Sequence, residues 1–350
     1  MFTNTRKKAM KRSSSRCRAP IPWLGAVGSA LAIVAALVAW PPAAEPNSSG
    51  RVPRVGVLWP YSSSVAWPFS EALRQGLREV GYVEGYNLVV EERWADGSLD
   101  RLPSLAAELA RGKVDVIVAA STPAVQAARQ ETRTIPIVMT LISDPVASGI
   151  AASLGRPGGN VTGLSLMHPE LSGKRVALLK EVNPRITRVA AFWSGSTPSY
   201  PIVLRGTEIA ARSLGMQVLP IEVRGPGGLD SAFAAISREQ ATALVVLPDP
   251  MFRNQHKRII ELAAHQRLPT MYWSRELVDA GGLMSYGASI PDIHRRAAVF
   301  VDKILKGARP GELPVEQPTK FELVINLKTA RTLGLTISQS LLQQADQALE

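Results

Sequence analysis

Residues 54–80, RVGVLWPYSSSVAWPFSEALRQGLREV, contain a strand signal followed directly by a helix signal. Arg54–Trp59 is a short apolar run with β-branched valines, which is typical of a strand buried on both faces. From Phe69 to Val80 apolar residues recur at intervals of three and four, which predicts one buried face of an α-helix. The stretch therefore predicts a β-α unit, from which parallel sheets are built.

The same alternation continues to the end of the chain. Strands are expected at 87–94, 114–119, 135–141, 160–167, 188–193, 217–223, 243–247, 270–273, 283–286 and 321–327. Helices are expected at 102–110, 123–130, 146–154, 171–182, 203–214, 229–238, 253–265, 293–305 and 341–349. Because the pattern starts again after residue 167, we predict an α/β protein with two doubly wound, Rossmann-like lobes.

The N-terminal 40 residues have the layout of an export signal. Residues 1–20 form a basic region with seven Lys or Arg side chains and no acid, and residues 21–40 carry no charge. A basic segment before an apolar one indicates a secretory signal or a membrane anchor. Both remain open, because Pro41 and Pro42 make a poor cleavage site. Residues 41–52 are predicted to be a linker, and the rest is expected in the periplasm or another extracytoplasmic space.

Charge and cysteine content exclude several classes of protein. The net charge of +11 falls to +4 once the basic region is set aside, so the basicity fits membrane topology better than nucleic-acid binding. The single cysteine, Cys17, excludes a disulfide framework and a cysteine-based zinc site. We expect no nucleic-acid partner.

Enzyme signatures are missing from the sequence. There is no G-x-G-x-x-G after the first strand, no Walker A motif and no G-x-S-x-G elbow. His256 and His265 would lie on opposite sides of one helix, so they cannot share a metal ion. Asp144 and Asp249 are imaginable as an acid–base pair, but no nucleophile or metal site accompanies them. We expect no cofactor, no metal and no catalytic residues, with a two-lobed α/β enzyme as an alternative.

A small polar residue followed by proline recurs at the predicted strand ends. The junctions are Ser121-Thr122-Pro123, Ser143-Asp144-Pro145, Ser196-Thr197-Pro198 and Asp249-Pro250. Such residues suit helix starts, and the carboxyl ends of strands are where open α/β sheets bind ligands. Helix N-termini favour a carboxylate, whereas Asp144 and Asp249 suit an ammonium group, so a zwitterion would use both. Trp193 and Tyr286 are candidate aromatic walls.

Several longer motifs resemble the ABC-transporter substrate-binding family that includes tryptophan/tyrosine uptake binding proteins. The resemblance covers about residues 53–348. It rests on FSEALRQGL (69–77), GYVEG (81–85), DPVASG (144–149), RPGGNVTG (156–163), GGLMSYG (281–287), LPVEQPTKFELVIN (313–326) and LGLTI (333–337). The fold implied by the resemblance is that of type I periplasmic binding proteins, two lobes joined by a multi-strand hinge.

The resemblance implies lobe limits that the linear pattern does not give. Lobe 1 would comprise 53–167 and about 286–318, and lobe 2 would comprise 168–285 and about 319–350. The ligand positions that it implies are Ser121, Thr122, Ser143, Asp144, Asp249 and Tyr286, to which we add Trp193. Where relatives often have Asn-Pro, this chain has Ser194-Gly195-Ser196-Thr197, so a contact to an amino-acid backbone is in question.

The function implied by the resemblance is that of the solute-binding component of an ABC importer. It would bind an amino acid or similar small organic molecule by hinge closure, and deliver it to a permease with its ATPase subunit. A monomer is the family default. The alternative within the same fold is a ligand-binding sensor subunit, held in the membrane by residues 23–40.

Overall fold

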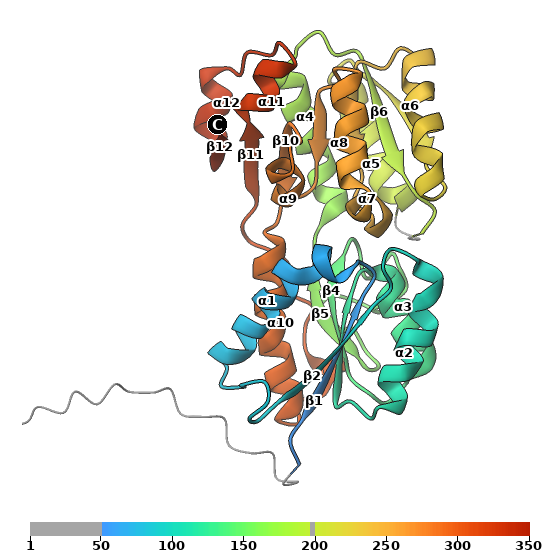
Figure 1. Cartoon of the computed structure of the whole chain (residues 1–350), viewed down its shortest axis with the longest axis vertical. Helices are drawn as coiled ribbons and strands as arrows, with labels where there is room; N and C mark the ends of the chain where they lie inside the picture. The colour runs from blue at the N-terminus through green and yellow to red at the C-terminus, as the bar shows by residue number, and fades with distance from the viewer. Residues whose placement is uncertain (1–50, 197–199) are drawn as a thin grey trace, which may run out of the picture. The chain divides into compact units, whose positions relative to one another are not determined.

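Two separate sheets organise residues 51–196 and 200–350, the part of the chain that this computed structural model describes (Figure 1). The first sheet has the order β2-β1-β3-β4-β5 and is parallel throughout. Its strands are β1 (Arg54–Trp59), β2 (Val89–Trp94), β3 (Val116–Ala120), β4 (Ile137–Ile142) and β5 (Val161–Ser165). We call this sheet and the helices packed on it lobe 1.

The second sheet has the order β12-β11-β10-β9-β8-β6-β7 and defines lobe 2. Its strands are β6 (Arg188–Trp193), β7 (Gln217–Glu222), β8 (Ala243–Val246), β9 (Thr270–Tyr272), β10 (Met284–Gly287), β11 (Glu322–Asn326) and β12 (Gln347–Leu349). The pairing is parallel except between β10 and β11, where the chain returns from lobe 1 in the opposite direction. The predicted α/β architecture of two lobes with mainly parallel sheets is confirmed.

Helices cover both faces of each sheet. Lobe 1 carries α1 (Ser63–Glu79), α2 (Leu102–Arg111), α3 (Thr122–Glu131) and α10 (Ile290–Leu305). Lobe 2 carries α4 (His168–Val182), α5 (Tyr200–Ser213), α6 (Leu229–Arg238), α7 (Pro250–Asn254), α8 (His256–His265), α9 (Arg275–Asp279), α11 (Leu327–Thr332) and α12 (Gln339–Gln344). Short 3₁₀ turns lie at Leu99–Arg101, Pro226–Gly228 and Pro310–Glu312. The apolar faces of these helices meet the strands in one core cluster on each side of each sheet.

The chain passes between the lobes repeatedly. It leaves lobe 1 between β5 and α4, returns between β10 and α10, and leaves again before β11. Figure 1 shows α10 beside α1, and its apolar face belongs to the core of lobe 1. The contact is close enough that a Cβ on Gly76 would lie 2.0 Å from the Arg295 carbonyl oxygen. We keep the lobe limits 53–167 with 286–318, and 168–285 with 319–350, as a proposal.

Three predicted helices differ from the structure. Residues 146–154 form turns, because Asp144 Oδ1 accepts the N–H groups of Val146 and Ala147 and Gly149 has a φ of +65°. The segment 253–265 is broken at Gln255 into α7 and α8. The helix expected at 341–349 ends at Gln344, and the chain then adds β12 beside β11.

The predicted export segment lies outside the described residues, as does most of the linker. Within 51–196 and 200–350, none of the helices is long and apolar enough to cross a bilayer.

Candidate ligand-binding site

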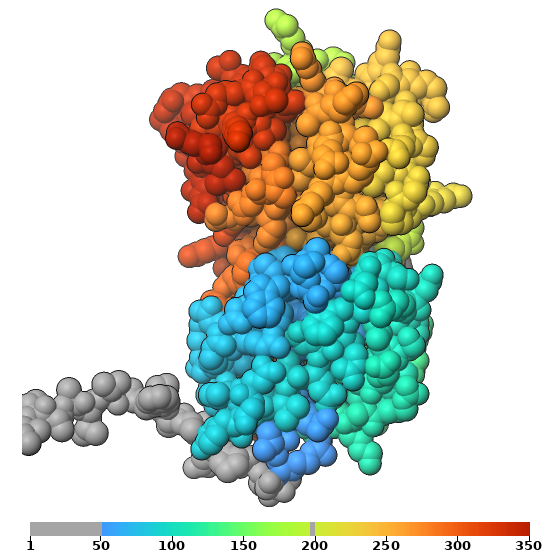
Figure 2. All heavy atoms as spheres, viewed as in Figure 1, coloured from blue at the N-terminus to red at the C-terminus, as the bar shows by residue number. Residues whose placement is uncertain are grey.

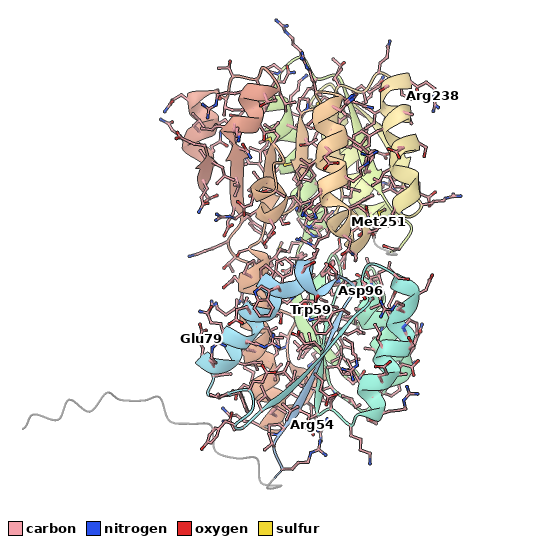
Figure 3. The ribbon with its side chains drawn as sticks, in the orientation of Figure 1. Arg54, Trp59, Glu79, Asp96, Arg238 and Met251 are labelled. Atoms are coloured by element: carbon pink, nitrogen blue, oxygen red, sulfur yellow. The ribbon has the colours of Figure 1, made fainter. Side chains whose placement is uncertain are left out.

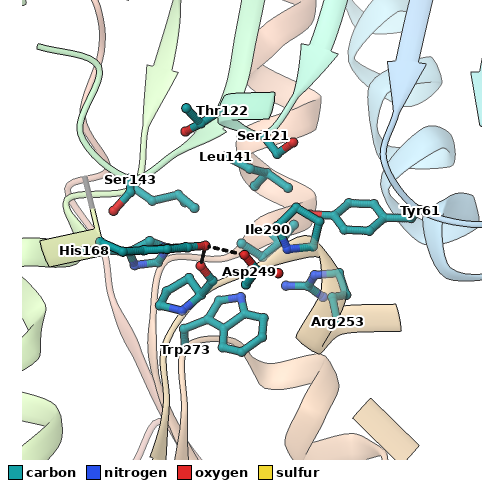
Figure 4. Close-up of a pocket in the computed structure, with 14 residues that line it drawn as sticks. Tyr61, Ser121, Thr122, Leu141, Ser143, His168, Asp249, Arg253, Trp273 and Ile290 are labelled. Carbon is teal, nitrogen blue, oxygen red and sulfur yellow. Dashed lines mark hydrogen bonds between the residues drawn. The ribbon is translucent and has the colours of Figure 1, made fainter. Parts of the chain in front are cut away.

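A pocket lies where the two lobes meet (Figure 4). The room that it leaves for a water-sized molecule is about 30 Å³, so the two lobes close tightly around it in this structure. Its walls come from Tyr61, Ser121, Thr122, Leu141, Ser143, Leu166 and Ile290 near lobe 1, and from His168, Tyr200, Pro248, Asp249, Pro250, Arg253 and Trp273 of lobe 2. The pocket thus lies at the carboxyl ends of the strands, as expected for α/β sheets.

Ser121 and Thr122 form the junction between β3 and α3. Ser121 has φ 90° and ψ 157°, a conformation that residues other than glycine rarely adopt. Its hydroxyl is buried and finds no hydrogen-bond partner among the described residues, nor does it cap α3. The start of α3 therefore presents a partly positive helix end and an unused hydroxyl to the pocket, both of which suit an anion.

Ser143 presents a second unused hydroxyl from the next strand. It follows β4, whose register with β5 is irregular between Met139 and Ile142, and Leu141 there has a φ of +58°. The Ser143 Oγ is buried, and within the described ranges it has no partner. Both hydroxyls on this wall are thus available to a polar ligand.

Asp249 supplies the negative charge of the pocket. Its side chain is 4% exposed, and it forms no ion pair with any described residue. Oδ1 accepts the Met251 N–H at 2.6 Å, which caps α7, while Oδ2 accepts hydroxyls from Ser194 and Ser196 and lies 3.1 Å from the Tyr200 hydroxyl. The serines that replace the expected Asn-Pro pair thus orient this carboxylate.

Arg253 is a pocket residue that sequence reasoning missed. It lies on α7, four residues after Asp249, and its guanidinium donates to Ser274 Oγ at 2.9 Å. Its Cζ lies 5.1–5.7 Å from the ring centroids of Tyr61 and Phe69 of lobe 1 and of Trp273 of lobe 2. The only hint in the sequence was the i, i+4 spacing, which places Arg253 on the same side of a helix as Asp249. The aromatic rings around Arg253 come from distant parts of the chain, so the sequence does not show them.

A further contact between the lobes lies beside Arg253. Figure 2 shows the first turns of α1 against the surface of lobe 2, and Ser64 and Val65 line a groove there with His256 and Lys257. Further along the boundary, Figure 3 shows Asp96 and Met251 on opposite sides of it. At that place a Cβ on Gly97 would lie 3.1 Å from the Asn254 side-chain nitrogen.

His168 is another pocket residue that the sequence did not single out as a ligand position. It begins α4, where the chain enters lobe 2, and it is 1% exposed. Burial lowers the pKa of its imidazole well below the ordinary value, and the charges of Arg175 and Arg253 lower it further. The ring is therefore neutral at physiological pH.

Asp144, Trp193 and Tyr286 lie away from the lining of this pocket. The Asp144 carboxylate holds the turn after β4. Trp193 packs against the core of lobe 2, and the Tyr286 ring packs there and against Phe321. Of the seven nominated residues, the structure brings Ser121, Thr122, Ser143 and Asp249 together in the pocket.

Two α/β lobes with a polar pocket between them define a binding protein of the periplasmic type. A family model described as "ABC transporter substrate binding protein" matches residues 55–349. The chain therefore belongs to the ABC transporter substrate-binding protein family. The members of this family are solute-binding proteins and not enzymes, and they work with ABC transporter components outside the cytoplasm.

Three relatives illustrate the family. A tyrosine-binding protein of Clostridioides difficile is 26% identical over 262 residues, 75% of either chain. An ABC domain from Streptococcus pneumonia, solved in complex with L-Trp, superposes with a TM-score of 0.81 at 25% identity, over 85% of this chain and all of that one. A ligand-free, open substrate binding protein of Clostridium difficile with adhesive properties has a TM-score of 0.62 at 22% identity, over 85% of this chain and 99% of that one.

Proposed function

We propose that this protein binds an L-α-amino acid as a zwitterion in the pocket between its lobes. The observation that carries the proposal is the opposition of two kinds of group in the pocket (Figure 4). The free hydroxyls of Ser121 and Ser143, with the start of α3, suit the ligand's carboxylate. The buried carboxylate of Asp249 suits its ammonium group. The tyrosine- and tryptophan-binding relatives support this ligand class.

The test is binding of L-tyrosine, L-tryptophan and the other L-amino acids to the full-length chain in mild detergent. Calorimetry gives the dissociation constants, and melting curves give an independent readout. An amino acid at 100 times its dissociation constant should raise the free energy of unfolding by about 2.7 kcal/mol. Tyramine, which lacks the carboxylate, and 3-(4-hydroxyphenyl)propanoate, which lacks the ammonium group, should each bind at least about 100-fold more weakly than L-tyrosine.

Two matched variants test which aspartate meets the ammonium group. Asp249→Asn should abolish measurable binding, because it removes the negative charge and places amide N–H groups where the ligand's cation is expected. The new N–H groups would also face the hydroxyl and N–H donors that Asp249 now accepts. Asp144→Asn removes the same charge from a residue outside the pocket lining and should leave the dissociation constant within about twofold. Binding that survives Asp249→Asn but not Asp144→Asn would contradict this assignment.

We also propose that the protein is exported, acts without turnover, and delivers its amino acid to an ABC permease with an ATPase subunit. Edman sequencing of protein recovered from cells distinguishes cleavage after the apolar segment from retention of residues 23–40 as an anchor. An amino acid recovered chemically unchanged after prolonged incubation supports a binding role, whereas a new product would favour the enzyme alternative. Co-purification with a signalling partner in place of a permease would favour the sensor alternative.

A further inference from the structure

Arg175 is a buried cation behind the pocket. It lies on α4, it is 1% exposed, and it forms no ion pair within the described part of the chain. Its Nε donates to the Tyr286 carbonyl oxygen at 2.8 Å, and its Nη2 lies 3.1 Å from His168 Nδ1. Its Nη1 has no partner among the described residues. Moving a single charge from water into the protein interior costs free energy, so a buried arginine without a counter-ion needs an explanation.

The direction of the contact between Arg175 and His168 follows from chemistry. A guanidinium has N–H donors and no acceptor, so His168 Nδ1 must accept with its lone pair. Burial lowers the pKa of Arg175 to about 9, which still leaves the guanidinium charged at pH 7. A neutral imidazole that accepts at Nδ1 carries its proton at Nε2. The ring of His168 is therefore a donor at Nε2.

The Nε2–H of His168 has nothing to donate to in the described structure. The atom is buried and unpartnered, while the ring lines the pocket. Figure 4 shows His168 and Ser143 on the same side of the pocket. A buried donor without an acceptor is unfavourable, and a ligand oxygen placed there would satisfy it.

We propose that Arg175, which does not line the pocket, is a positioning residue that fixes His168 in its Nε2–H form, and that this N–H donates to the carboxylate of the bound amino acid. The inference rests on the proposed function for the nature of the ligand. The uncompensated charge of Arg175 adds a reason for an anionic acceptor, because a carboxylate close to His168 would offset it. The same charge disfavours protonation of His168, which would turn Nδ1 into a second donor facing Arg175.

His294 provides an internal reference with the opposite tautomer. Its Nδ1 lies 3.0 Å from the Ile290 carbonyl oxygen, which can only accept, so Nδ1 carries the proton. Its Nε2 lies 3.2 Å from Thr140 Oγ1 and accepts from that hydroxyl. One protein sample therefore contains a buried Nε2–H histidine and a buried Nδ1–H histidine for comparison.

The test is long-range ¹H–¹⁵N correlation of the histidine rings in the ¹⁵N-labelled full-length chain, with His168→Gln to assign the signal. We expect the Nε2–H pattern for His168 and the Nδ1–H pattern for His294. Arg175→Met should convert His168 to a tautomer mixture, and Arg175→Lys, which can still donate to Nδ1, should restore the Nε2–H form. Lys174→Met, which removes an exposed charge one residue away, should change nothing.

Binding of L-tyrosine and L-tryptophan completes the test. Either amino acid, when bound, should shift the His168 Nε2–H proton, and Arg175→Met should weaken its binding about tenfold, with Arg175→Lys within about threefold of the wild type. Three outcomes would overturn the inference while leaving the proposed function intact. They are an Nδ1–H pattern for His168, an unchanged tautomer in Arg175→Met, and a bound amino acid that leaves the His168 signals unmoved. Failure of all amino acids to bind contradicts the proposed function instead, because the tautomer is read in the free protein.

Discussion

Backbone strain at Ser121 is the clearest conflict between stability and function at the scale of one residue. Its φ of 90° and ψ of 157° lie in a region that is open mainly to glycine, and such residues cost on the order of 1–3 kcal/mol. The strain sits next to the start of α3, and the hydroxyl that it places in the pocket is unused by the described protein groups. The strained backbone thus lies at the wall of the proposed ligand pocket.

Replacing Ser121 separates the strain from the hydroxyl. Ser121→Gly should raise the free energy of unfolding above that of Ser121→Ala by about 1 kcal/mol, because glycine adopts this backbone without strain. Both variants should bind L-tyrosine more weakly than the wild type, since both lack the hydroxyl. Urea unfolding and calorimetry measure the two effects. A Gly variant less stable than the Ala variant would disprove the strain argument.

The buried imidazole of His294 should make the protein sensitive to acid. Burial lowers its pKa to about 4, against an ordinary value of about 6.5 in the unfolded chain. The unfolded state therefore takes up a proton first, so stability is complete above pH 6.5 and is lost as the pH falls toward 4. The full loss corresponds to about 3 kcal/mol. His168, whose pKa is also lowered, acts in the same direction.

Urea unfolding of the wild type and His294→Gln across pH 4–7 checks this. The variant should be less stable at pH 7, because it disturbs the contacts to Thr140 and Ile290, but its stability should fall less steeply below pH 6.5. Parallel curves for the two proteins would show that His294 does not titrate as described.

At the scale of helices and strands, periodicity predicted well where one face of a helix is buried and failed where side-chain bonds compete. The helices α2 and α6 and the strands β1 and β6 lie within about one residue of the expected ranges. Residues 146–154 fail because Gly149, with a φ of +65°, ends the turn that Asp144 begins by bonding the amides of Val146 and Ala147. Asp249, in a similar sequence context, caps α7 through Met251.

Two glycines inside helices should respond oppositely to alanine. A Cβ on Gly76 of α1 would meet the Arg295 carbonyl of α10 at 2.0 Å, so Gly76→Ala should lower the free energy of unfolding by about 2 kcal/mol or more. A Cβ on Gly173 of α4 would meet Ala210 at an ordinary 3.6 Å, so Gly173→Ala should raise it by about 0.5–1 kcal/mol through helix propensity. Thermal and urea unfolding measure both changes. Equal changes in the free energy of unfolding for the two variants would show that α1 and α10 are not closely packed at Gly76.

At the scale of the whole molecule, lobe 1 depends on a helix that follows most of lobe 2 in the sequence. All strands of the first sheet precede residue 166, yet Ile293, Phe300 and Val301 of α10 are buried in its core. The crossings between lobes therefore make the two lobes interdependent, and they provide the connections about which one lobe can move against the other.

A fragment of residues 51–167 should consequently fail to fold, although it contains the complete first sheet. Without α10 it exposes the apolar face of α1 and one face of the sheet. Circular dichroism and amide hydrogen exchange should show little protected structure, and co-expression with residues 286–318 should restore it. A stable, protected 51–167 fragment would show that α10 is dispensable to lobe 1.

The sequence alone determined the alternation of strands and helices, the two lobes, and the polar strand ends at Ser121, Ser143 and Asp249, because period and local capping are properties of neighbouring residues. The tertiary structure decided which of these groups share the pocket. Asp144 and Asp249 both precede a proline at a strand end. Asp144 bonds the turn after β4, whereas Asp249 lies at the start of α7 and lines the pocket. His168, Arg175 and Arg253 became visible only in the fold, since contacts between residues far apart in the chain depend on which surfaces the lobes bury.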